Sequence, residues 1–172
     1  HIITSKIEHH AILHSCEHLE SLGYKVTYLD VSKEGVVNTE QLEQLLKKGS
    51  QSQNVDDKVS VVSIMYGNNE IGTIQPVEEI SRLCKKYEAI FHTDAVQAVG
   101  QIPIHVRKLP VDMLSASAHK FHGPKGVGFL YIKEGVQMPS FIHGGGQESG
   151  KRAGTENVAG IVGMAKALSI AQ

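Results

Sequence analysis

Three short polar clusters contain the side chains of this sequence that are best suited to chemistry. They are Gly67-Asn68-Asn69-Glu70, His92-Thr93-Asp94-Ala95-Val96-Gln97 and Ser117-Ala118-His119-Lys120. Between them they supply a primary amine, a carboxylate, amides, and a hydroxyl beside an imidazole. An amine can hold an aldehyde as an imine, a carboxylate can keep a ring nitrogen protonated, and hydroxyl and imidazole groups can bind a phosphate. Pyridoxal 5′-phosphate (PLP) chemistry needs this combination of groups.

Lys120 is the most informative residue of the three clusters. Small residues precede it from Ser115 to Ala118, and a Gly123-Pro124 turn follows it. Most lysines are solvated at the surface, but this setting predicts an amine held in a pocket at the end of a strand. We therefore predict that Lys120 forms a Schiff base with an aldehyde cofactor.

The order of apolar segments predicts how the clusters are positioned. Runs typical of strands alternate with helical patterns, which indicates an α/β fold with a mostly parallel sheet sandwiched by helices. Strands are expected at 2–4, 25–31, 59–65, 89–92, 111–117 and 126–132, helices at 9–22, 38–48, 76–87 and 158–171, and a polar surface loop at 49–58. Ligands of such sheets bind at the carboxyl ends of the strands, so the three clusters should share one pocket.

Composition limits the class of protein. A chain of 172 residues with 41% hydrophobic residues can bury the core of one globular domain. The net charge of -1 gives no electrostatic case for nucleic acid or for an acidic membrane surface. No apolar run approaches the roughly 20 residues that a membrane span needs. Two cysteines do not make a disulfide framework, and no signal peptide is visible, so a cytoplasmic location is expected.

Both ends of the sequence fall within regular structure. The chain opens on a strand-like Ile2-Ile3-Thr4 and closes inside a helix-like run from Val158 to Ala171. We therefore expect it to be part of a larger domain.

The stretch around Lys120 resembles the PLP lysine loop of NifS/IscS-like cysteine desulfurases, in the class V aminotransferase superfamily. The resemblance covers essentially the whole chain. It implies that residues 1–172 are the central part of the PLP-binding large domain of a fold-type I enzyme. The family's upstream Gly-Ala-Thr phosphate loop is not in these residues, nor is its small C-terminal domain with the nucleophilic cysteine and the substrate-carboxylate arginine. Ser149 stands where the family often has arginine.

The resemblance implies a role for each matched residue around the ring. Lys120 matches the Schiff-base lysine, and Asp94 matches the acid at the pyridine nitrogen. Gln97 and Asn69 match amides near the ring hydroxyl. His9, in Ser5-Lys6-Ile7-Glu8-His9, matches a histidine that stacks on the ring and assists proton transfer.

The resemblance also implies a set of phosphate ligands. Ser117 and His119 match ligands within the same chain. Thr155, in Arg152-Ala153-Gly154-Thr155-Glu156-Asn157, matches a threonine that reaches the phosphate across a dimer interface. A homodimer is therefore implied.

Several of these residues also have a plainer interpretation. Asp94 and Gln97 could cap a helix after a strand, and His9 could simply begin a helix. Asn69 could serve a turn, and Thr155 could be the N-cap of the following helix.

Two further groups of residues invite functional interpretations that we do not favour. Cys16 and Cys84 fall on apolar helix stripes, which indicates core residues rather than sulfur-accepting nucleophiles. His10, His14 and His18 are spaced for one helix face and could bind a metal. That face lies away from the apolar stripe, so we expect a solvated surface and predict no metal site.

The resemblance implies a PLP-dependent conversion of L-cysteine to L-alanine. The sulfur would pass to an enzyme persulfide and then to an acceptor protein of the scaffold or tRNA-thiolation type, for iron–sulfur or thio-cofactor assembly. The fragment alone is expected to be inactive. Alternatives are a selenocysteine lyase, a cysteine-sulfinate desulfinase, or a cofactor-free fragment with only a fold or dimerisation role.

Overall fold

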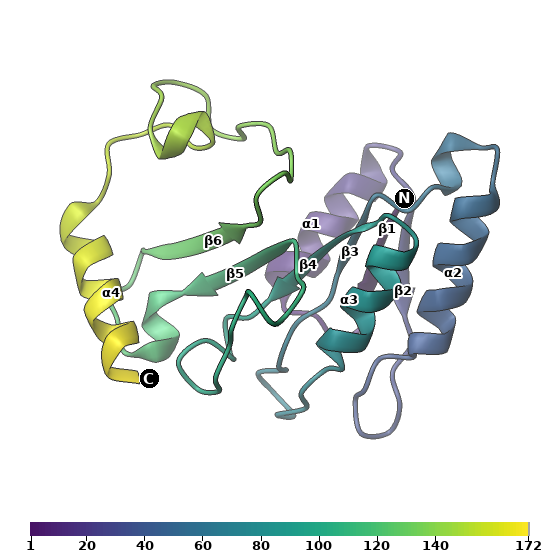
Figure 1. Cartoon of the computed structure of the whole chain (residues 1–172), viewed down its shortest axis with the longest axis horizontal. Helices are drawn as coiled ribbons and strands as arrows, with labels where there is room; N and C mark the ends of the chain where they lie inside the picture. The colour runs from purple at the N-terminus through teal and green to yellow at the C-terminus, as the bar shows by residue number, and fades with distance from the viewer. Residues whose placement is uncertain (172) are drawn as a thin grey trace.

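A six-stranded sheet forms the centre of the computed structural model, which describes residues 1–171 (Figure 1). The strand order is β2-β1-β3-β4-β5-β6. β1 to β5 are parallel, and β6 is antiparallel to β5. The strands are β1 (Ile2–Ser5), β2 (Val26–Leu29), β3 (Val61–Ser63), β4 (Ile90–Asp94), β5 (Met113–Ser117) and β6 (Gly128–Ile132). The expected α/β fold with a mostly parallel sheet is confirmed.

Helices cover both faces of this sheet. They are α1 (His10–Ser21), α2 (Thr39–Gln51), α3 (Val77–Lys86) and α4 (Val158–Ala171), with short 3-10 helices η1 (Val55–Asp57), η2 (Ala118–Phe121) and η3 (Glu148–Gly150). Figure 1 shows α2 and α3 in front of the sheet and α1 behind it, with α4 beside η2.

The connections place a topological switch point between β1 and β3. The chain leaves β1 for α1 on one face and leaves β3 for α3 on the other face (Figure 1). The two loops therefore diverge at the carboxyl ends of adjacent strands. In doubly wound α/β sheets, ligands bind in the crevice that such a divergence opens.

The main apolar core lies between the sheet and the α2–α3 face. α3 shows why this helix docks there: its apolar residues Val77, Ile80 and Cys84 are all buried. Acidic residues occupy its first turn and Lys85 and Lys86 its last turn, which matches the helix dipole as expected. Phe91 of β4 is completely buried beneath this face.

The structure corrects the expected bounds of several elements. α2 continues to Gln51, and η1 follows, so the predicted loop over 49–58 is only partly a loop. The end of α2 packs closely on the η1 segment, because a side chain at Gly49 would meet the Asp57 backbone oxygen at 2.6 Å. Pro76 is the N-cap of α3 rather than its first helical residue. Leu22, the last residue of the helix expected at 9–22, is the C-cap of α1 and is 61% exposed.

Candidate functional site

The polar clusters meet at the carboxyl edge of four adjacent strands. β1 ends at Ser5, β3 at Ser63, β4 at Asp94 and β5 at Ser117, and these strands are neighbours in that order. With strands about 4.8 Å apart, the row from β1 to β5 spans roughly 14 Å. The sheet therefore brings the three clusters to one edge, as the sequence predicts.

Asp94 is the buried acid of this edge. Its side chain is only 8% exposed, and it stands opposite Ser115 in the β4–β5 register. Oδ1 accepts a 3.0 Å hydrogen bond from the Val96 amide, but the residues that follow form turns rather than a helix, so the plainer interpretation as a helix cap is wrong. Gln97, half-buried, follows on the same turn.

Lys120 lies in η2, immediately after β5, with an exposed side chain. The expectation of an enclosed amine is therefore wrong for the described residues, because η2 carries Lys120 outward and turns Ala118 and Phe121 into the core. Gln101 Nε2 donates a 3.3 Å hydrogen bond to the Lys120 backbone oxygen. This contact ties the lysine loop to the segment that follows Asp94.

Ser117 and His119 form a hydroxyl–imidazole pair beside Lys120. Ser117 Oγ lies 2.8 Å from His119 Nδ1. The imidazole is exposed and the serine is half-buried at the end of β5. Both residues precede the exposed Lys120 closely in sequence, so the three belong to the same strand end.

His9 caps α1 through its ring. Its backbone is extended, and Nδ1 accepts a 3.1 Å hydrogen bond from the Ala11 amide. An Nδ1 that accepts must be unprotonated, so the neutral ring carries its hydrogen on Nε2. The ring is exposed, at the switch point between β1 and β3. The helix-start interpretation is confirmed, while the stacking role stays a prediction.

The two asparagines that follow β3 divide their tasks. Asn68 is buried; Nδ2 donates to the Ile7 backbone oxygen at 2.8 Å, while Oδ1 accepts from the amides of Glu70 and Ile71 at 2.8 and 3.0 Å. Asn69 is exposed. Asn68 therefore holds the loop to the β1–α1 connection, and Asn69 is presented on it.

Thr155 lies in the segment between η3 and α4 and is exposed. The N-cap of α4 is Asn157, whose Oδ1 accepts a 3.1 Å hydrogen bond from the Gly160 amide. The plainer interpretation of Thr155 as the cap is therefore wrong, because Asn157 occupies the capping position. Its role toward a phosphate stays a prediction.

Two titratable residues near this edge were given no role by sequence reasoning, the buried Glu8 and the half-buried His92. Glu8 is 5% exposed, and Oε1 accepts hydrogen bonds from Ser5 Oγ at 2.6 Å and from the Met65 amide at 2.9 Å. His92 lies between two hydroxyls, with Nδ1 2.8 Å from Ser63 Oγ and Nε2 3.2 Å from Ser115 Oγ. Successive side chains of a strand point to opposite faces of the sheet, which gave a hint that His92 and its neighbour Phe91 lie on different faces. Nothing in the sequence distinguished Glu8 from a solvated glutamate.

Burial moves the pKa values of these two groups in opposite directions. It raises the pKa of Glu8 to about 7, and the Asp94 charge adds to this, while hydrogen bonds from Ser5 and Met65 oppose it. Burial lowers the pKa of His92, with Asp94 acting in the other direction. Both groups therefore favour the neutral form at this edge.

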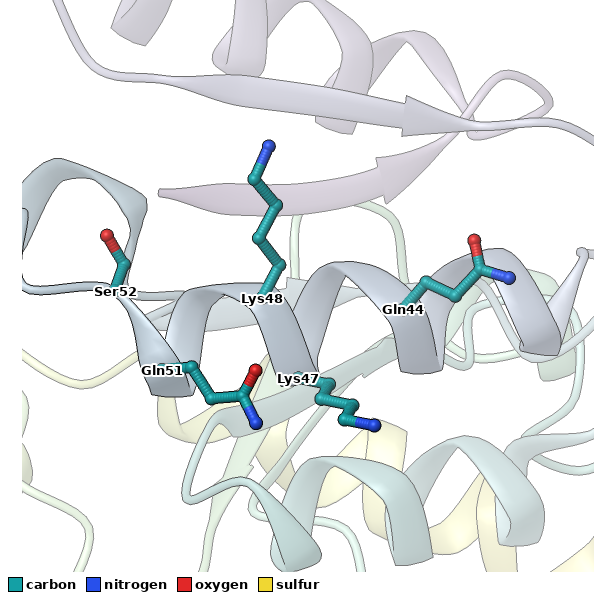
Figure 2. Close-up of a pocket in the computed structure, with 5 residues that line it drawn as sticks. All are labelled: Gln44, Lys47, Lys48, Gln51 and Ser52. Atoms are coloured by element: carbon teal, nitrogen blue, oxygen red, sulfur yellow. The ribbon is translucent and has the colours of Figure 1, made fainter.

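Two hollows in the surface lie away from these residues. The first, of about 430 Å³, runs along α2 near its end and is lined by Gln44, Lys47, Lys48, Gln51 and Ser52. Figure 2 shows Lys47 and Gln51 on one side of α2 and Lys48 pointing to the other, so this hollow follows the outside of a helix.

The second hollow, of about 440 Å³, is lined by residues such as Lys85, Asp112 and Lys133. These residues precede β4 and β5 or follow the antiparallel β6. They therefore belong to the amino edge of the sheet, opposite the clusters.

The cysteines are buried as expected. Cys84 lies in the main core, and burial, with a contribution from Asp112, raises the pKa of its thiol to about 12. Cys16 is 4% exposed, and burial followed by the charge of Glu8 raises its thiol pKa.

The three histidines of α1 lie on its solvated side. His10, His14 and His18 are exposed, and the rings of His10 and His14 are 5.0 Å apart. Within residues 1–171, no three His, Cys, Asp or Glu side chains gather closely enough to hold a metal ion. No helix in the same range is long and apolar enough to cross a membrane.

The donor set at this edge fits the chemistry of PLP. Lysine, imidazole and hydroxyl groups end β5, and a buried carboxylate ends the adjacent β4. A phosphate needs the first group of donors, and a protonated ring nitrogen needs the acid. Lys120, His119 and Ser117 would hold the aldehyde and phosphate, and Asp94 would face the ring nitrogen.

Comparisons with known proteins agree with this arrangement. The sequence profile of the family Aminotransferase class-V matches residues 1–172. The chain is 56% identical over 171 residues to a protein of Dictyoglomus turgidum named cysteine desulfurase IscS, covering 99% of this chain and 41% of that one. It therefore spans about two fifths of the length of this curated relative.

Solved structures share the fold. A NifS-like protein of 52% identity superposes with a TM-score of 0.89, covering 99% of this chain and 45% of its own. The structure titled SspA in complex with cysteine, at 39% identity, also gives 0.89, covering 98% of this chain and 47% of its own. The sheet and helices thus match NifS-like proteins of the PLP-dependent fold type I.

Proposed function

The chain belongs to the class-V aminotransferase family, and we propose that it is the central part of the PLP-binding large domain of a cysteine desulfurase. One observation carries the proposal. Neighbouring parallel strands end in a buried Asp94 on β4 and in the Ser117, His119 and Lys120 group on β5. Relatives that cover 99% of the chain and bear the name cysteine desulfurase support the same function.

PLP, when bound, supplies an electron sink for a substrate amino acid. In the proposal, the Lys120 amine holds the cofactor aldehyde and later takes the proton from the substrate α-carbon. Asp94 keeps a proton on the ring nitrogen. Gln97 and Asn69 bind the ring oxygen, and His9 covers the ring face.

The phosphate is assigned to the half-buried Ser117 and the exposed His119, whose side chains already lie 2.8 Å apart, and to Thr155 of a second copy. An exposed Thr155 that is not needed for capping is free for this contact. A homodimer is therefore part of the proposal, as is a cytoplasmic location.

The nucleophile that receives sulfur is assigned to a cysteine outside these 172 residues. Thiol burial supports this, because a persulfide-forming cysteine needs an accessible thiolate, and both thiols here are buried with raised pKa values. We expect L-cysteine as substrate, L-alanine as product and a sulfur-acceptor protein as partner. The chain alone should not complete turnover.

The first test is PLP binding by the chain itself. Purified protein is mixed with PLP, its visible absorbance is recorded, and borohydride then fixes bound PLP for peptide mass analysis. We expect a visible band and a PLP-sized mass increase on the peptide that contains Lys120.

Lys120→Ala should lose both signals, and Lys125→Ala is the matched control. Lys125 is an exposed lysine on the same loop, so its loss should leave band and adduct in place. A PLP adduct on Lys125, or equal labelling of several lysines, would contradict the proposal.

A further inference from the structure

Glu8 has an arrangement that the proposed function does not use. It lies at the switch point, on the loop that joins β1 to α1. Oε1 accepts two hydrogen bonds, one from Ser5 at the end of β1 and one from the Met65 amide just beyond β3. Glu8 therefore joins the two loops that diverge to opposite faces of the sheet.

The second oxygen of Glu8 is buried without a partner. The shielded side chains of residues 1–171 contain one fully buried polar atom that makes no hydrogen bond. This atom is Glu8 Oε2. An ionised carboxylate in this setting would leave a buried charge unpaired, which is strongly unfavourable. Since Oε1 already accepts two hydrogen bonds, the proton of a neutral Glu8 belongs on Oε2.

The charges that face Glu8 reinforce the neutral form. From β4, Asp94 contributes a negative charge, and from α1 the thiol of Cys16 lies close enough for the two groups to influence one another. The contacts from β3 and its exit, made by Met65 and Asn68, carry no charge. No cation contributes to the raised pKa of about 7.

The loop held by Glu8 carries His9. Glu8 precedes His9 directly, and Asn68 donates to the backbone oxygen of Ile7 on the other side of Glu8. Three hydrogen bonds thus fix the residues just before the ring, through Ser5, Met65 and Asn68. The exposed imidazole itself is held by a single bond to the Ala11 amide.

We propose that Glu8 is a positioning residue, a proton-bearing carboxyl that fixes the His9 ring and adds no second buried carboxylate charge beside Asp94. The relevance of His9 and Asp94 to a cofactor rests on the proposed function, whereas the proton and the loop contacts do not. Glu8 touches no reacting group. It acts through the loop that bears His9 and through the field at Asp94.

The test compares four forms of the full chain without cofactor: the parent, Glu8→Gln, Glu8→Ala and Glu17→Gln. Glutamine keeps the acceptor at Oε1 and replaces the O–H by N–H, so it mimics the protonated acid. Glu17 is an exposed glutamate on α1 and is the matched control. Ring nitrogen NMR of histidine-labelled protein, assigned with His9→Gln, reports the hydrogen bond that His9 Nδ1 accepts from the Ala11 amide.

We expect the parent, Glu8→Gln and Glu17→Gln to share a His9 Nδ1 signal that is shifted by the hydrogen bond from the Ala11 amide, and Glu8→Ala to lose this shift while the other histidine signals stay. An unchanged His9 signal in Glu8→Ala would overturn the proposal. This readout separates positioning from general stability, because a merely stabilising residue would not change the hydrogen bond of one ring in protein that is still folded.

The pH dependence of stability gives a second readout, which does not require Glu8→Ala to fold. The pKa of Glu8 is raised from 4.5 to about 7 in the folded state. In the unfolded chain, Glu8 therefore loses its proton at a lower pH than in the folded chain. The contribution of Glu8 to stability is lost as pH rises from 4.5 to 7. Relative to Glu8→Gln, the folding constant of the parent should fall up to tenfold per pH unit in this window.

Parallel pH profiles for the parent and Glu8→Gln would overturn the proton assignment. The Glu17→Gln profile should follow that of the parent. PLP titration of the same proteins separates the two proposals: if none of the four binds PLP, the proposed function fails for this chain. The His9 signal and the pH profiles still decide the role of Glu8.

Discussion

His92 Nδ1 lies 2.8 Å from Ser63 Oγ, which links β4 to β3 two residues before Asp94. The other ring nitrogen, Nε2, lies 3.2 Å from Ser115 Oγ of β5. A line of polar side chains therefore crosses three strands of the sheet just before the candidate site. It ties together the strands that carry Asp94 and the lysine loop.

This arrangement predicts a loss of stability in mild acid. Burial lowers the pKa of His92 below its ordinary value of 6.5. The unfolded chain therefore takes up a proton first, so stability present above pH 6.5 is lost as pH falls below it. Urea unfolding between pH 7.5 and 5 should show a steeper decline for the parent than for His92→Gln.

His105→Gln is the control for this prediction, because His105 is exposed. Its stability should decline with the same slope as that of the parent. Glu8 acts with the opposite sign over a similar range, but it is common to all three proteins and cancels in the comparison. Equal slopes for the parent and His92→Gln would show that His92 titrates normally.

Asn68 and Asn69 should differ in their effect on stability. Asn68→Ala removes a buried amide that makes three hydrogen bonds to the backbone. We expect it to lower the free energy of unfolding by about 1–3 kcal/mol, because Ile7 O and two amides lose a partner. The exposed Asn69→Ala should stay within about 0.5 kcal/mol of the parent. Urea unfolding measures both, and a reversed order would refute the assignment.

The two cysteines should be unreactive in the folded chain. Both are buried and their thiol pKa values are raised, so little thiolate is available to an alkylating reagent. Thiol labelling of native protein should be slow for both and complete only after denaturation. Ser15→Cys, an exposed position on α1 near Cys16, supplies an internal standard and should label at once. Rapid native labelling of Cys16 or Cys84 would reopen either as a nucleophile.

Gly128 should be required for the strand pair that leads to Lys120. It stands opposite Ser117 in the β5–β6 register, and a side chain there would meet the Ala116 backbone oxygen at 2.5 Å. Gly128→Ala should therefore cost about 1–3 kcal/mol, as overpacking does. It should also speed hydrogen exchange at the Ala118 amide, which donates to Val127 at 3.0 Å.

Gly67→Ala is the matched control for Gly128, because a side chain at Gly67 meets nothing within 4 Å. It should change neither stability nor exchange at Ala118. If Gly128→Ala leaves stability and exchange at Ala118 as unchanged as Gly67→Ala does, the close approach of β5 and β6 at Gly128 is not needed to hold the lysine loop.

Much of the architecture could be predicted from local patterns. The apolar stripe and charged ends of α3, the strand ending near Asp94 and the strand before Lys120 all follow from periodicity over a few residues. Such patterns are local and need no knowledge of neighbouring elements. The bounds did not follow from these patterns: α2 continues to Gln51, and its last turn packs on Asp57, a contact outside the helix.

Local patterns along the chain were enough to predict the order of the main helices and strands, the family resemblance, and the three polar clusters at strand ends. Which polar residues are buried, and with which partners, follows from the folded arrangement alone. Glu8 differs from an exposed glutamate because the segment just beyond β3 supplies the Met65 amide, 57 residues away in sequence. His92 is likewise held by residues of two other strands. Burial and hydrogen bonding across strands are properties of residue pairs distant in the chain, so they arise only when the sheet has formed.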